Sequence, residues 1–117
     1  MISFEQFRQQ PARRYEAGET IFREGDDGYA MYVVLDGSVK LSVTGRGVEK
    51  VTKGGVFGEM ALIVSSPRSA TAVAGTECTL VTITADKFKA LIRETPDFAL
   101  DIMMVMAARL RSMDRKL

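Results

Sequence analysis

The sequence predicts a mainly β protein with flanking helices, and three observations lead to this class. Short apolar segments recur along residues 13–84, and several of them alternate hydrophobic with polar residues. Glycine-containing turns separate these segments, a pattern typical of β-sandwiches and barrels. From Ala85 onward the apolar spacing becomes helical, with hydrophobic residues three and four positions apart.

The β region contains two segments with a particularly clear pattern. Residues 31–35 are almost continuously apolar, and residues 39–43 alternate, so that one face is apolar and the other polar. The Asp36-Gly37 pair between them predicts a hairpin turn, and residues 45–47 predict the next turn. The remaining strands are expected at residues 14–16, 20–23, 48–51, 70–74 and 79–83.

Helices are expected at both ends of the chain. A short one over residues 2–9 would begin after the N-cap Ser3 and end before Pro11. A second would cover residues 85–92, with Thr84 as its N-cap. The helices therefore flank the β region, and the strands are expected to form the body of the protein.

The composition limits the classes of partner. The chain has 117 residues, 46% hydrophobic and 26% charged, which is ordinary for one soluble globular domain. Its net charge of +1 gives no reason to expect a nucleic-acid or membrane partner. The chain carries neither a membrane-length apolar stretch nor the pattern of a signal peptide. Cys78 is the single cysteine, which fits a reducing cytoplasm, and a cytoplasmic location is expected.

One stretch, residues 54–74, combines several groups that suit a nucleotide. Its sequence is GGVFGEMALIVSSPRSATAVA. Gly58 lets backbone approach a ligand closely, and the short helix expected over residues 59–63 presents N–H groups that suit an anion. The Glu59 carboxylate can accept hydrogen bonds from sugar hydroxyls, and the Arg68 guanidinium matches phosphate geometry. These groups together indicate a nucleotide-like ligand.

This stretch resembles the phosphate-binding cassette of the cyclic-nucleotide-binding domain family. The resemblance lies in Phe57-Gly58-Glu59-Met60-Ala61-Leu62, followed by Pro67-Arg68-Ser69-Ala70-Thr71. It implies a double-stranded β-helix jelly roll over residues 12–84, with the cassette at 54–74 and C-terminal helices at 85–117. The whole chain, residues 1–117, would be a single cyclic-nucleotide-binding domain.

The resemblance also implies roles for individual residues. Glu59 would bind the ribose 2′-OH, and Arg68 would neutralise the cyclic phosphate. The expected ligand is cAMP, because cGMP-preferring members often carry threonine where this chain has Ser69. Binding of cGMP is possible, because Ser69 keeps a hydroxyl at this position. The alternative is that Glu59 and Arg68 form an ordinary surface salt bridge beside a turn. The full set of expected ligand-binding residues is Phe57, Gly58, Glu59, Met60, Ala61, Arg68, Ser69 and Ala70.

Enzymatic activity is not expected. The chain has no histidine, which excludes imidazole acid–base catalysis and histidine metal ligands. Hydrolysis of a cyclic phosphate ordinarily needs metals held by histidines and carboxylates. A jelly-roll enzyme of the cupin kind would likewise need a histidine cluster. We therefore expect no cofactor and no metal.

The last helix is expected over residues 97–116, and it is too apolar to have only one buried face. The excess implies a second contact: a nucleotide base, a second chain, or both. Its hydrophobic residues at helical spacing are Phe98, Ile102, Val105, Met106, Leu110 and Met113. Its basic residues, Arg109, Arg111, Arg115 and Lys116, are expected to suit the helix C-terminus rather than to bind nucleic acid.

The expected function is that of a stand-alone cyclic-nucleotide sensor. No output domain follows the last helix and only about a dozen residues precede the β region, so signalling would pass through residues 97–116 to a protein partner or a second copy. Two alternatives keep the fold. One is a non-binding interaction domain that assembles through the last helix. The other binds a different ligand, as family members that sense haem, iron–sulfur clusters or organic acids do, although the lack of histidine and the single cysteine argue against the first two.

Overall fold

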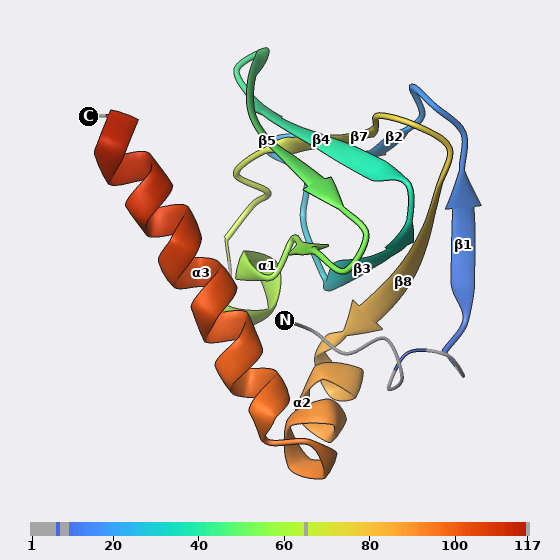
Figure 1. Ribbon diagram of the computed structural model, residues 1–117, viewed down its shortest axis with the longest axis vertical. Coiled ribbons are helices and arrows are strands. Elements are labelled where there is room, and N and C mark those ends of the chain that lie inside the picture. The colour runs from blue at the N-terminus through green and yellow to red at the C-terminus, as the bar shows by residue number, and fades with distance from the viewer. Residues whose placement is uncertain (1–6, 8–9, 65, 117) are drawn as a thin grey trace.

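The computed structural model describes Phe7, residues 10–64 and residues 66–116, with side chains through residue 111. Two antiparallel four-stranded sheets face each other, with strand orders β1-β8-β3-β6 and β2-β7-β4-β5 (Figure 1). The strands are β1 Ala12–Tyr15, β2 Thr20–Phe22, β3 Ala30–Asp36, β4 Ser38–Val43, β5 Arg46–Thr52, β6 Val56–Phe57, β7 Thr71–Ala74 and β8 Cys78–Thr84. The helices are α1 Met60–Ile63, α2 Ala85–Glu94 and α3 Asp97–Lys116. The predicted mainly β class with flanking helices is confirmed.

The first sheet is covered on both faces, which explains the continuous apolar run of β3. Val34 and Leu80 point into the space between the sheets, where they join a core that includes Val39 and Leu41 of the second sheet. Met31 and Ile83, on the other face of the same strands, join a second core with residues of α2 and α3. A strand buried on both sides has no polar face, and its sequence does not alternate.

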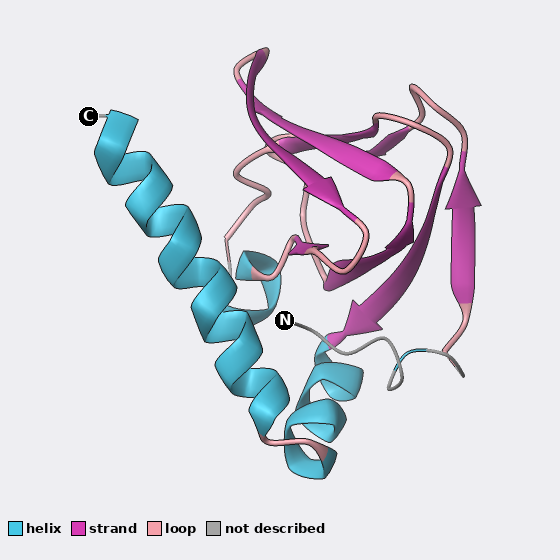
Figure 2. Cartoon of the chain, in the orientation of Figure 1, coloured by secondary structure: helices cyan, strands magenta, loops and turns pink. Residues whose placement is uncertain are grey.

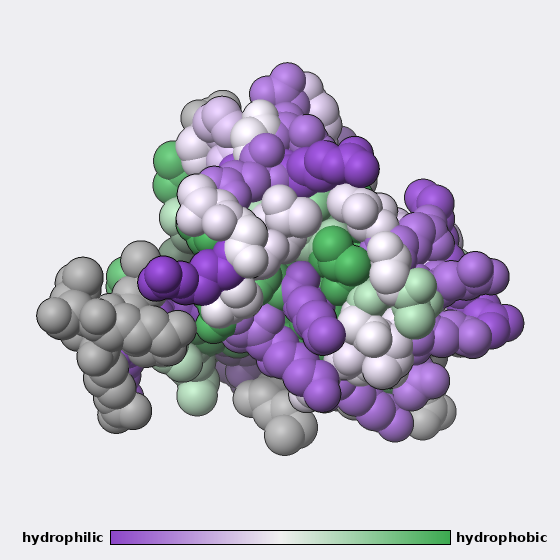
Figure 3. All heavy atoms as spheres, turned by 90° about the horizontal axis from the view of Figure 1, so that it is seen from above, coloured by the Kyte–Doolittle hydropathy of each residue, from purple (hydrophilic) through white to green (hydrophobic). Residues whose placement is uncertain are grey.

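The second sheet has one face exposed to solvent and therefore shows the predicted alternation. In β4, Val39 and Leu41 are buried and Lys40 is exposed. Seen from above, hydrophilic residues make up most of the visible surface, and a hydrophobic patch lies near its centre (Figure 3).

The turn predicted at residues 45–47 is wrong by one position. The left-handed residues are Thr44 and Gly45, with φ of 50° and 80°. Arg46 already pairs with Val43, and Gly47 lies within β5. Two consecutive left-handed residues are what a type I′ hairpin loop requires, so Gly45 completes the turn, and Gly47 lies in the strand beside a register shift.

The helices cover one side of the first sheet. In Figure 2, α2 follows β8, and α3 then runs diagonally past the sheets with the short α1 beside it. Phe98 and Ile102 of α3 are buried, and the ring of Phe98 meets Phe7 at 6.1 Å in an edge-on arrangement. The predicted helix over residues 2–9 falls outside the described residues, apart from Phe7. Among the described helices, none is long and apolar enough to span a membrane.

Candidate functional site

The cassette, residues 54–74, contains β6 and the turn that follows it. Gly58, directly after Phe57, has a left-handed backbone with φ of 79°, which residues with a Cβ rarely adopt. It turns the chain from β6 into α1, whose N-cap is Glu59. The helix is thus one residue shorter than predicted. Phe57 is fully buried in an aromatic cluster, with its ring 5.2 Å from that of Tyr32, so it supports the cassette from the core.

Arg68 lies in the interior of this site, only 8% exposed. Its Nη1 donates to the carbonyl oxygen of Gly58 at 3.0 Å, and its Nη2 donates to that of Ala30 at 2.7 Å. The guanidinium carbon lies 4.0 Å from the centre of the Phe22 ring. Its Nε is buried without a hydrogen-bond partner among the described residues. Arg68 is therefore held by neutral oxygens and an aromatic face, and it retains an unused donor.

The charge of Arg68 is not compensated by a direct ion pair among the described residues. Burial lowers the pKa of the guanidinium, although Tyr32, Asp26 and Glu59 act in the opposite direction. An arginine starts with so high a pKa that it stays protonated at neutral pH. A buried cation bonded only to carbonyls favours an incoming anion, because the anion supplies the missing counter-charge.

A small pocket of about 50 Å³ lies next to Arg68. This volume is enough for a few water molecules. Phe57 and Glu59 are not among the residues that line it. Six of the predicted site residues do line it: Gly58, Met60, Ala61, Arg68, Ser69 and Ala70.

Glu59 is buried, at 4% exposure, and its partner comes from the last helix. Its carboxylate accepts a hydrogen bond from Nη1 of Arg109 in an ion pair. The alternative of a Glu59–Arg68 surface salt bridge is therefore wrong: within the described residues Glu59 pairs with Arg109, and Arg68 takes carbonyl oxygens. The sequence placed Arg109 among residues that serve the helix C-terminus, and this assignment is also wrong.

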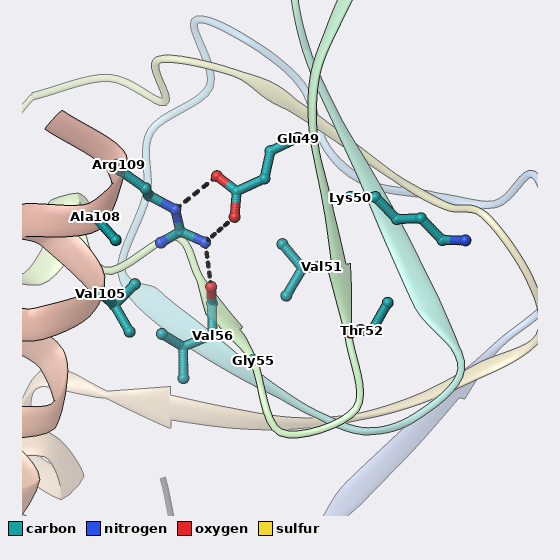
Figure 4. A pocket seen from close by; sticks show the side chains of 9 residues that line it. All are labelled: Glu49, Lys50, Val51, Thr52, Gly55, Val56, Val105, Ala108 and Arg109. Atoms are coloured by element: carbon teal, nitrogen blue, oxygen red, sulfur yellow. Dashed lines mark hydrogen bonds and ion pairs between the residues drawn. The ribbon is translucent and has the colours of Figure 1, made fainter. Parts of the chain in front are cut away.

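Arg109 is held from three directions. Its Nε and Nη2 donate to the two carboxylate oxygens of Glu49 on β5, at 2.9 and 3.0 Å, and Nη2 also donates to the carbonyl oxygen of Val56 at 2.5 Å (Figure 4). Burial alone would lower the pKa of Arg109, but the hydrogen bonds and charges of Glu49 and Glu59 raise it. This network ties α3 to β5, β6 and the cassette.

A larger cavity, of about 410 Å³, opens between β5 and α3 beside this network. Figure 4 shows Arg109 reaching across it from α3, with Val105 and Ala108 along the helix and Val51 on the strand. Its volume falls within the range of small-molecule sites. Its lining residues are Glu49, Lys50, Val51, Thr52, Gly55, Val56, Val105, Ala108 and Arg109.

The sequence contained one signal for Arg109. Phe98, Ile102 and Val105 face the core at helical spacing, and Arg109 continues the same face. A charged residue on the apolar face of a helix predicts a buried partner. Glu49 carried no comparable signal, because it lies in a strand whose residues are exposed apart from Val51.

Comparison with known proteins gives the family. A model of the cyclic nucleotide-binding domain matches residues 12–95, and the chain therefore belongs to this family. It is 38% identical over 110 residues to the cyclic AMP receptor protein of Thermus thermophilus, covering 90% of this chain and 51% of that protein. It is 44% identical over 63 residues to a cAMP-dependent protein kinase regulatory subunit of Eremothecium gossypii, covering 54% of this chain and 14% of the subunit.

Solved structures agree with the fold. The crystal structure of the Thermus thermophilus catabolite activator protein matches with a TM-score of 0.81 and 36% identity, over 92% of this chain and 53% of the other. The predicted jelly roll is thereby confirmed. The chain spans about half the length of the Thermus relative, at 51%.

Proposed function

We propose that this chain is a regulatory module that binds a cyclic nucleotide, cAMP or cGMP, and carries out no chemistry itself. The observation that carries the proposal is the setting of Arg68: a buried guanidinium with an unused donor, beside a pocket lined by the cassette. In this function Arg68 binds the cyclic phosphate, and the N–H groups of Met60, Ala61 and Ala70 and the hydroxyl of Ser69 complete the phosphate site.

The sugar and base occupy the neighbouring space in this proposal. Glu59 accepts a hydrogen bond from the ribose 2′-OH, in addition to or in place of its bond from Arg109. The base extends toward the larger cavity between β5 and α3, whose apolar wall includes Val51 and Val105. Because the pocket beside Arg68 is only about 50 Å³, binding requires α1 and its flanking loops to move outward.

Such a movement would reach α3 through Arg109, because Glu59 and Arg109 share an ion pair. A ligand shifts an equilibrium only through contacts that differ between two states, and the Glu59–Arg109 pair is such a contact. The outer face of α3 is available to transmit the change, since four large apolar side chains on it are 56% to 63% exposed: Leu100, Met103, Met104 and Leu110. We propose that a protein partner or a second copy covers this face.

The decisive experiment is calorimetric titration of the chain with cAMP and with cGMP. Binding of either nucleotide, with a raised melting temperature, supports the proposal. A ligand at 100 times its dissociation constant adds about 2.7 kcal/mol of stability. Hydrogen exchange then tests the signalling step: altered protection in residues 97–111 is expected upon binding, and protection gained only in residues 54–74 would leave a passive binder.

A second candidate function is a non-binding interaction domain that assembles through α3. The small pocket at Arg68 and the ion pair already formed by Glu59 favour it. Sedimentation of the nucleotide-free chain separates the two functions: a stable dimer that neither nucleotide alters, together with silent titrations, would favour the interaction domain.

A further inference from the structure

The turn between β2 and β3 contacts Arg68 at a residue that has no side chain. A Cβ placed on Gly28 would lie 2.6 Å from Arg68 Nε and 2.8 Å from Arg68 Cζ. It would also lie 2.9 Å from the Cβ of Ala61 in α1. Real Cβ atoms essentially never approach other atoms this closely, so the packing of Arg68 against α1 requires glycine here.

Backbone hydrogen bonds fix this contact. The N–H of Gly25 donates to the carbonyl oxygen of Arg68 at 2.8 Å, and the N–H of Arg68 donates to that of Asp26 at 2.8 Å. The turn and the backbone of residue 68 are therefore tied together on both sides, and Gly28 follows two residues later. It lies over the Nε edge of the guanidinium, the donor that has no partner among the described residues.

Gly28 is glycine for reasons of space and not of backbone conformation. Its φ is not among the positive values, so a left-handed backbone is not what requires glycine here. The guanidinium is the flexible end of a long side chain, so it can move away from an added methyl group. Such a movement would break the bonds to Gly58 and Ala30 and would turn Nε away from its present direction.

We propose that Gly28 is a positioning residue for the phosphate site: its missing side chain fixes where the Arg68 guanidinium and α1 lie relative to each other. The expected effect of replacing Gly28 on nucleotide affinity rests on the proposed function, because it assumes a cyclic phosphate as ligand. Gly28 lies outside the cassette and forms no bond with the anion in this proposal. It acts through the position of Arg68.

The test compares Gly28→Ala with Gly47→Ala. Gly47 has no positive φ, and no described atom lies within 4 Å of a Cβ placed on it, so it controls for the loss of glycine itself. Gly28→Ala is expected to weaken cAMP or cGMP binding by about 5- to 150-fold, the range that over-packing costs produce. In an Arg68→Ala background it should weaken binding clearly less, because the contact with the guanidinium is gone and only the contact with Ala61 remains. Equal losses in both backgrounds would overturn the positioning role.

A second measurement needs no nucleotide. The proton–nitrogen correlation signal of Arg68 Nε–H, assigned by its disappearance in Arg68→Ala, should shift in Gly28→Ala and stay in place in Gly47→Ala. An unchanged signal in Gly28→Ala would overturn the inference even if nucleotide binds. Conversely, a shifted signal in a chain that binds neither nucleotide would support the role of Gly28 and would reject only the proposed function.

Discussion

Two arginines in this protein, the buried Arg68 and the partly buried Arg109, have opposite hydrogen-bonding environments. Arg68 donates to two backbone carbonyls and keeps Nε unpartnered among the described residues, whereas Arg109 donates to two carboxylates and a carbonyl. Arg109 is thus neutralised within the protein, and Arg68 is not. An arginine that already holds carboxylates ties elements together, and one that holds only neutral oxygens favours an anion. The difference supports the proposal that Arg68 binds the ligand, whereas Arg109 attaches α3 to the sheet and the cassette.

The largest expected effect comes from Arg68→Ala. Removing one partner of a desolvated charge pair costs about 2–5 kcal/mol, or roughly 30-fold to several thousand-fold in affinity. Calorimetry with cAMP measures it, and Arg93→Ala, at an exposed position on α2, is the control. Arg68→Lys should also bind poorly, because lysine keeps the charge and loses the planar fork. Affinity within threefold of the parent in Arg68→Ala would contradict the contrast between the two arginines.

Glu59→Gln should have an intermediate effect. The amide still accepts a hydrogen bond from the ribose 2′-OH but lacks the charge, so the expected loss is about 1–3 kcal/mol. The 2′-deoxy nucleotide should bind the parent protein more weakly than the ribonucleotide by a similar free energy. The substitution Glu59→Gln should then weaken binding of the 2′-deoxy nucleotide little further, because the hydrogen bond is already absent.

Glu49→Gln is the matched control for this comparison of Glu59→Gln with the 2′-deoxy nucleotide, because Glu49 pairs with the same Arg109 and lies outside the cassette. The change in binding free energy caused by Glu49→Gln should add fully to the change caused by removing the 2′-hydroxyl of the nucleotide. Full additivity in Glu59→Gln as well would mean that Glu59 contacts something other than the ribose.

Arg109→Ala should change affinity least. Arg109 lines the larger cavity toward which the base extends but not the pocket beside Arg68, so the phosphate contacts remain and affinity should fall by no more than roughly threefold. Stability should nevertheless drop by about 1–3 kcal/mol, because the buried Glu59 loses its charged partner. Hydrogen exchange should become faster in residues 97–111. Arg111→Ala, two residues further along and exposed, should leave both properties unchanged. A large affinity loss with intact α3 protection would place Arg109 in the ligand site instead.

Local pattern was sufficient for most of the fold and insufficient for the site. The alternation in residues 39–43 depends on neighbouring residues only, and the structure confirms β4. The turn at Asp36-Gly37 is also present, with Gly37 at φ of 82°, but the predicted hairpin is wrong: β3 pairs with β6 and β8, whereas β4 pairs with β5 and β7, so this turn carries the chain from one sheet to the other. Which strand pairs with which depends on tertiary packing and not on the turn residues. The turn at residues 45–47 was misplaced because Gly45 and Gly47 are equivalent in sequence, and only strand pairing separates them. Phe57 belongs to the cassette in sequence and to the core in space.

The sequence by itself determined the strand and helix pattern, the cassette and the identity of Arg68 as its cation, because each depends on residues close together in the chain. Tertiary structure alone decided how the charges are shared. Arg109 lies 60 residues from Glu49 and 50 from Glu59, and Gly28 meets Arg68 only because backbone hydrogen bonds tie the β2–β3 turn to residue 68. Such contacts form when separate elements pack together, and no local pattern of residue types encodes them.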